Sequence, residues 1–109
     1  MDPRHEELLR RLALHDEATV ETLIPMESAD ASGVELGART EALVRLASLI
    51  ALQPAATSFE WAVTAAFAAG ADDEEIVGVL LAVAPLVGAA RASRAAADIA
   101  TAIGYDLDL

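Results

Sequence analysis

The run from Ile76 to Ala90 constrains this chain more than any other feature, because its fifteen residues carry no polar side chain. Pro85 lies inside the run, four acidic residues precede it, and Arg91 follows it. A membrane-spanning helix needs about 20 apolar residues, so burial inside a folded domain is the better interpretation. A helix that is apolar on all sides must be covered on all sides. One chain of 109 residues supplies few neighbours, and we therefore expect copies of the chain to associate.

Composition favours an all-α fold with a thin core. Alanine occupies 26 positions and aromatic residues make up only 4% of the chain. Alanine is the best helix former and is depleted in strands. Each alanine buries little apolar area. Close packing between helices, or association between chains, would compensate for this.

Charge and residue types exclude several classes of function. Eighteen acidic residues against seven arginines give a formal charge of −11, which repels nucleic acids and anionic membrane surfaces. The chain has no cysteine, so disulfides, thiolate nucleophiles and cysteine-ligated metals are excluded. His5 and His15 have no matching carboxylates at metal-ligand spacing, and we expect neither a metal nor a cofactor. The first residues do not form a secretory signal, and we expect a cytoplasmic protein.

The pattern along the chain predicts an N-terminal helical arm and loop over 1–35 and a helical domain over 36–109. Asp2-Pro3 is typical of a helix start, and the helix that follows is amphipathic. A second short helix is expected to stop at Pro25. Residues 25–38 are rich in Ser, Asp and Gly, which indicates a loop.

Three or four helices are expected in the domain. The first covers about 40–52, and the second begins at Thr57 or Ser58 and ends before Gly70. The third begins at Asp72 with a capping pattern and is interrupted by Pro85. The last covers about 86–103 and ends at Gly104, a typical helix-ending glycine.

The stretch from Leu36 to Ile103 resembles the carboxymuconolactone decarboxylase-like family, which includes the alkylhydroperoxidase D-type proteins. The resemblance is carried by TEALVRLASLIAL at 40–52, FEWAVTAAFAAGA at 59–71 and DDEEIVGVLLAVAPLVG at 72–88. An alanine-rich helix follows these pieces. The resemblance implies a helical bundle of the alkylhydroperoxidase D-like type that assembles into trimers or hexamers.

The resemblance also locates the family's chemistry on this sequence. The peroxidase branch uses a Cys-x-x-Cys pair and a His four residues later, which fall on Ala55, Ser58 and Ala62 here. The decarboxylase branch places a His at the position of Ala62. Thiol redox chemistry needs a thiolate, so we expect a degenerate redox site.

Several side chains near that position remain candidates. Glu60, if buried, would serve as a general acid or base; if exposed, it belongs to a solvent-facing stripe. Glu41 and Arg45 would hold an anionic substrate and move a proton, or form an ordinary helix-surface ion pair. Ser58 is either a pocket residue or a helix cap. A pocket beside Ala62 would be lined by Phe59 and Trp61, which otherwise belong to the core.

Three classes of function follow from these candidates. The first is a homo-oligomer that binds a small apolar ligand or acts as a scaffold. The second is a thiol-independent decarboxylase, lyase or isomerase that acts on a small organic acid, with Glu60, Glu41 and Arg45 as catalytic residues. The third is an interaction module whose helical faces bind partner helices.

Overall fold

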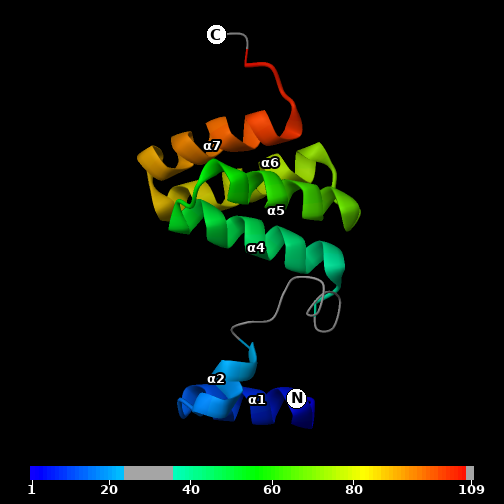
Figure 1. Ribbon diagram of the computed structural model, residues 1–109, viewed down its shortest axis with the longest axis vertical. Helices are drawn as coiled ribbons and strands as arrows, with labels where there is room; N and C mark the ends of the chain where they lie inside the picture. The colour runs from blue at the N-terminus through cyan, green and yellow to red at the C-terminus, as the bar shows by residue number, and fades with distance from the viewer. Residues whose placement is uncertain (24–35, 108–109) are drawn as a thin grey trace. The chain divides into compact units, whose positions relative to one another are not determined.

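The computed structural model describes residues 1–23 and 36–107, which form six helices and no strand (Figure 1). The all-α fold expected from composition is thereby confirmed for these residues. The chain divides into two compact units, residues 1–32 and 33–109. The expected loop over 25–38 falls mostly on residues 24–35, which lie outside the described residues, and so does the expected stop at Pro25.

The N-terminal unit contains α1 (Pro3–Ala13) and α2 (Glu17–Leu23). The carboxylate of Asp2 caps α1 by accepting a hydrogen bond of 2.9 Å from the Arg4 N–H. Pro3 is the first helical residue, where its missing N–H costs nothing. The predicted helix start at Asp2-Pro3 is therefore confirmed.

The second unit contains α4 (Ala38–Leu52), α5 (Ala56–Ala68), α6 (Asp73–Val87) and α7 (Ala89–Ile103). Each of α5 and α6 packs against both α4 and α7. In Figure 1, α5 lies in front of α6, and both lie between α4 and α7. All four helices contribute to one core of buried apolar side chains: Leu46, Ile50, Phe59, Val63, Ala66, Ala71, Ile76, Ala95 and Ile99.

Local sequence explains the turn between α5 and α6. Gly70 has a φ of 97°, and the Ala71 N–H donates to the Ala66 carbonyl oxygen at 2.9 Å. This is the bonding that ends many helices at a glycine. Asp72 then caps α6 with a capping box, in which Asp72 and Glu75 each accept a hydrogen bond from the other's backbone N–H. Both predicted signals are confirmed.

The predicted break at Pro85 is wrong. Helix α6 continues through Pro85 to Val87 and ends at Gly88, so α7 begins at Ala89 rather than at position 86. Proline removes one backbone donor, but its fixed φ is compatible with a helix. Gly88 makes the actual turn with φ 92° and ψ 163°, a backbone region that is essentially restricted to glycine.

Candidate functional site

The predicted pair of Glu41 and Arg45 forms on α4. Glu41 Oε1 lies 3.9 Å from Arg45 Nη2, which confirms the ion pair expected from their spacing. The Glu41 side chain is only 14% exposed, while the Arg45 guanidinium reaches solvent. The Glu41 carboxylate is therefore half-buried beside a cation.

Glu60 does not join this pair. It lies on the exposed side of α5 and makes no hydrogen bond or ion pair within residues 1–23 and 36–107. Thr64, one turn later, is exposed as well. The structure therefore places Glu60 in the solvent-facing stripe that was one of its two interpretations. The three proposed catalytic residues do not converge within one chain.

The four proposed pocket residues also lie on different sides of α5. Phe59 is 1% exposed and belongs to the core, whereas Trp61 is 74% exposed. Two residues along a helix correspond to about 200° of rotation, so these two rings point in nearly opposite directions. Ser58 and Ala62 are half-buried and lie one turn apart between them. No single wall of the chain carries all four side chains.

The prediction that Ser58 caps a helix is wrong. Helix α5 begins two residues earlier, at Ala56, and Ala55 occupies the capping position without a side-chain hydrogen bond. Ser58 is the third residue of the helix. Capping depends on where the chain enters the helix, and the preceding turn at Gln53-Pro54 sets that point.

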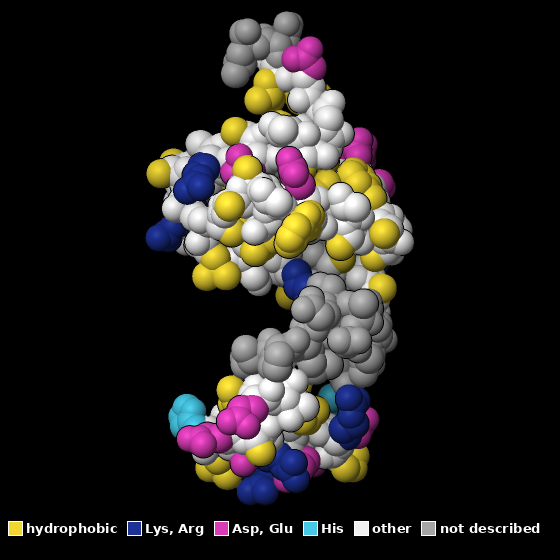
Figure 2. All heavy atoms as spheres, viewed as in Figure 1, with side chains coloured by type: hydrophobic (Ala, Val, Ile, Leu, Met, Phe, Trp, Pro, Cys, Tyr) yellow, Lys and Arg dark blue, Asp and Glu magenta, His cyan; other side chains and the backbone are white. Residues whose placement is uncertain are grey.

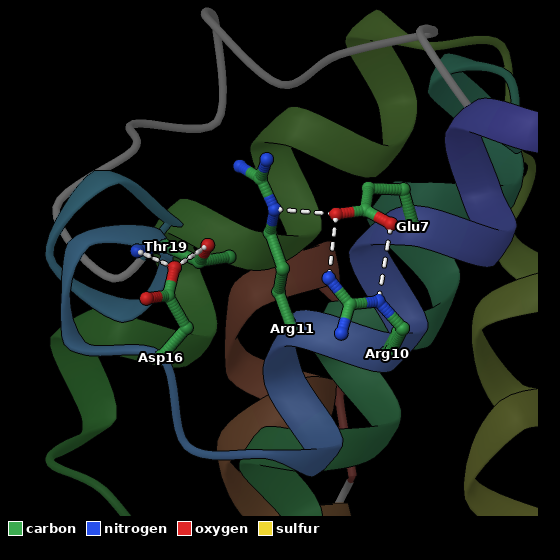
Figure 3. A network of polar contacts seen from close by, with 5 residues as sticks. All are labelled: Glu7, Arg10, Arg11, Asp16 and Thr19. Atoms are coloured by element: carbon green, nitrogen blue, oxygen red, sulfur yellow. Dashed lines mark hydrogen bonds and ion pairs between the residues drawn. The ribbon is translucent and has the colours of Figure 1, made fainter.

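The N-terminal unit carries a polar network (Figure 3). Glu7 accepts hydrogen bonds from Arg10 and Arg11, with the Arg11 Nε–Glu7 Oε1 distance at 2.9 Å. Hydrogen bonds from Arg10, and then from Arg11, lower the pKa of Glu7. These residues are exposed, and such a network stabilises a short helix without forming a closed site.

The two histidines lie in the same unit. His5 Nδ1 is 4.0 Å from Asp2 Oδ2. His15 lies in the α1–α2 turn with a φ of 58° and lines an open groove with Arg10, Arg11, Leu14, Asp16 and Glu17. Across the described ranges, no three His, Cys, Asp or Glu side chains come together to hold a metal ion.

The most distinctive surface of the second unit is the outer side of α6. Ile76 is buried and Val79, Leu80, Val83 and Val87 pack against the core, which leaves another side of the helix uncovered. We call this surface the α6 face; its exposed residues are Val77, Gly78, Leu81, Ala82, Pro85 and Leu86. They follow two parallel rows at four-residue spacing, so they form a continuous stripe. Leu81 is 67% exposed and Leu86 is 85% exposed.

Hydrophobic side chains also reach the surface on the side of the α4–α7 unit that Figure 2 shows. Single exposed apolar residues are common in proteins. The α6 face differs because no polar side chain interrupts it over the whole length from Val77 to Leu86. Contiguous apolar stripes of this kind mark sites of association or ligand binding.

The N-terminal end of the α6 face is acidic. Asp73 and Glu74 are exposed and lie one turn before Val77 and Gly78 on the same side of the helix. Beyond the other end, in the first turn of α7, the exposed Arg91 is the first charged residue. Arg91 makes no ion pair with any residue that the structure describes. The α6 face therefore has an acidic end, and its other end leads to Arg91 in α7.

Sequence reasoning missed two features of this region. One is the link between α4 and α6, where Arg39 Nη2 lies 2.9 Å from Glu75 Oε2; no short-range spacing signals it. The other is Gly78. An isolated glycine inside a helical pattern costs stability relative to alanine, and the side of the helix on which it lies becomes visible only in the structure.

None of the helices in the described ranges is long and apolar enough to cross a membrane. No protein-family model, curated protein or solved structure matches this chain.

Proposed function

We propose that this chain is a carboxymuconolactone decarboxylase-like protein with a degenerate redox site, and that it works as a homo-oligomeric scaffold or small-molecule-binding protein. A trimer or hexamer is the assembly that the resemblance implies. The observation that carries the proposal is the α6 face, because an uninterrupted apolar stripe on a chain of charge −11 needs a covering surface.

Residue types at the family's reactive positions support the loss of redox chemistry. Ala55, Ser58 and Ala62 stand where the resemblance places two thiols and an imidazole, and the chain has no cysteine anywhere. Ala55 and Ala62 carry no reactive group. Ser58 would need an adjacent base to act as a nucleophile, and no histidine lies near it in the sequence.

The mass of the particle in solution tests this proposal. We expect light scattering at micromolar concentration to give an integral multiple of the 11.3 kDa chain mass. A strict monomer over the same range would refute the homo-oligomer. Peroxide reduction coupled to a dithiol reductant should be absent, and robust turnover by the unmodified chain would refute the degenerate site.

A second candidate function is favoured by the half-burial of Glu41 beside Arg45. In a thiol-independent lyase or isomerase, Arg45 would bind the carboxylate of a small organic acid and Glu41 would transfer the proton. If a turnover is found, Glu41→Gln should abolish it, and Glu60→Gln should reduce it only where an assembled oligomer brings Glu60 to the same site. An activity untouched by Glu41→Gln would remove this candidate.

A further inference from the structure

We infer that the occupant of the α6 face is the α6 face of a second copy, packed antiparallel about a two-fold axis that passes beside Leu81 and Ala82. This inference rests on the proposed self-association. It adds which surface makes the contact, the relative direction of the two helices, and which residues face each other.

The first support is the position of Gly78. It lies in the interior of α6, near the N-terminal end of the exposed stripe, and a Cβ added there would meet nothing within 4 Å. Glycine inside a helix costs about 0.5–1 kcal/mol relative to alanine, and no contact within this unit requires it. A glycine and an alanine one turn apart, at Gly78 and Ala82, let another helix approach closely. The stripe also carries bulkier side chains at Leu81 and Leu86 that fit beside such a gap.

The second support is the distribution of charge. A parallel pair would bring residues 72–75 of both copies together, and all four residues are acidic. Like charges at close range are destabilising. An antiparallel pair instead sets Asp73 and Glu74 of one copy beside the end of the partner helix that leads to Arg91.

The register follows from covering the whole stripe. Centring residues 77–86 on the axis pairs positions whose numbers add to 163, so Gly78 faces Pro85 and Glu74 lies just beyond the end of the partner's α6, which ends at Val87. Arg91 follows that end in the first turn of α7. The register thus covers the apolar stripe and brings the acidic end of one α6 toward the end of the partner helix that leads to Arg91. A contact of this kind closes a dimer, or links two trimers into a hexamer, but does not by itself make a trimer.

The distance of a residue from the two-fold axis determines whether its two copies lie close enough to be joined by a disulfide. In this antiparallel pair, the two copies of residue 81 lie on the same side of the interface. They are within about 2 Å of each other along the helix axes, because each residue advances a helix by about 1.5 Å. The two copies of position 82 behave in the same way. Two copies of position 74 are about 22 Å apart, far beyond the Cα separation of about 4.4–6.8 Å that a disulfide spans.

Engineered cysteines test this directly, because the natural chain has none. Full-length Leu81→Cys, Ala82→Cys, Glu74→Cys and Leu52→Cys variants are oxidised mildly and analysed by non-reducing electrophoresis. Leu52 is 74% exposed at the end of α4 and controls for random collision. Ala82→Cys replaces a small residue and keeps the Leu81 side chain. It therefore tests the same part of the interface even if Leu81→Cys itself weakens association.

We expect Leu81→Cys and Ala82→Cys to form covalent dimers at least tenfold faster than Glu74→Cys and Leu52→Cys. Self-linking of Glu74→Cys would show a parallel pair and overturn the inference. An oligomer by light scattering in which neither Leu81→Cys nor Ala82→Cys links would also overturn it, while leaving the proposed self-association intact. A monomer by light scattering would refute both.

Discussion

Arg39 Nη2 lies 2.9 Å from Glu75 Oε2, so one ion pair joins the first turn of α4 to the first turn of α6. The other oxygen of the same carboxylate, Oε1, accepts a hydrogen bond of 3.2 Å from the Asp72 N–H. Glu75 therefore fixes the start of α6 in two ways, through its own helix and through a neighbouring one. The start of α6 is also where the acidic end of the α6 face is built.

The capping box at Asp72 should contribute more to the free energy of unfolding than the Arg39–Glu75 ion pair. Asp72→Ala removes the cap and should lower the free energy of unfolding by about 1 kcal/mol. Glu75→Gln keeps an oxygen for the Asp72 N–H and loses only an exposed ion pair, so about 0.2–1 kcal/mol should be lost. Urea unfolding followed by circular dichroism checks both values. An Asp72→Ala variant as stable as the natural chain would contradict the cap.

Phe59 and Trp61, two residues apart on α5, should differ sharply in how much their replacement lowers the free energy of unfolding. Phe59→Ala empties a core site and should cost about 3–5 kcal/mol, a large part of the total stability of a domain. Trp61→Ala removes an exposed ring, and exposed substitutions stay within about 0.5 kcal/mol. Thermal unfolding of the two variants at one protein concentration measures the contrast. Equal losses would mean that Trp61 is covered in solution.

Gly78→Ala should have opposite effects on the chain and on the assembly. Within one chain the new methyl group meets nothing, and replacing a helical glycine should stabilise the chain by about 0.4–1 kcal/mol. Against a closely packed partner helix the same methyl group would weaken association. Sedimentation at several concentrations, combined with urea unfolding, separates the two effects. Stronger association would argue against a close contact at Gly78.

Replacing Gly88 by alanine should have the opposite effect on the stability of the chain from replacing Gly78. The Gly88 φ of 92° and ψ of 163° lie in a region that alanine avoids, and residues forced into such regions cost about 1–3 kcal/mol. Gly88→Ala should therefore lower the free energy of unfolding, although the added Cβ itself has open space. Urea unfolding under the conditions used for Gly78→Ala gives the comparison. An unchanged midpoint would mean that the α6–α7 turn relaxes without strain.

The start of α2 should respond to acid. Hydrogen bonds from the Thr19 hydroxyl, and then from the Thr19 N–H, lower the pKa of Asp16 below its ordinary value of 3.8. A carboxyl whose pKa falls on folding stabilises the fold above its unfolded pKa and loses that contribution as the pH falls through the folded pKa. Helix α2 should therefore weaken only below about pH 4.

Carbon-13 NMR titration of the Asp16 carboxyl tests whether Thr19 lowers the pKa of Asp16. Thr19→Val removes the hydroxyl donor and should raise the pKa of Asp16 toward 3.8, while Thr19→Ser should leave it low. Equal pKa values in these two variants would show that the hydroxyl does not stabilise the Asp16 carboxylate.

Helix starts and ends that depend on neighbouring residues were predictable from the sequence. The cap at Asp2, the capping box at Asp72 and the glycine turn at Gly70 each involve groups a few residues apart, and short-range chemistry determines them. Pro85 and Ser58 were misassigned for a related reason. A proline disfavours a helix without forbidding it, and a serine caps a helix only if the chain turns there.

The candidate site was less predictable, because burial depends on which helices surround a residue. Phe59 and Trp61 are similar in character, yet packing of α5 against α4 and α7 buries the first and exposes the second. Sequence indicated that the α6 region is apolar all round. Only the fold shows that Ile76 points inward and that Leu81 points outward.

Sedimentation equilibrium of two matched variants tests whether copies of this chain associate through the α6 face. Leu81→Asp places a charge in the middle of the face, while Leu52→Asp places the same charge at a similarly exposed leucine on α4. We predict an unchanged oligomer for Leu52→Asp and a smaller particle for Leu81→Asp, with native helix content in both variants. The smaller particle is a monomer of about 11.3 kDa if the natural chain is a dimer, and a trimer if the natural chain is a hexamer. A particle of unchanged mass for Leu81→Asp would contradict association through the α6 face.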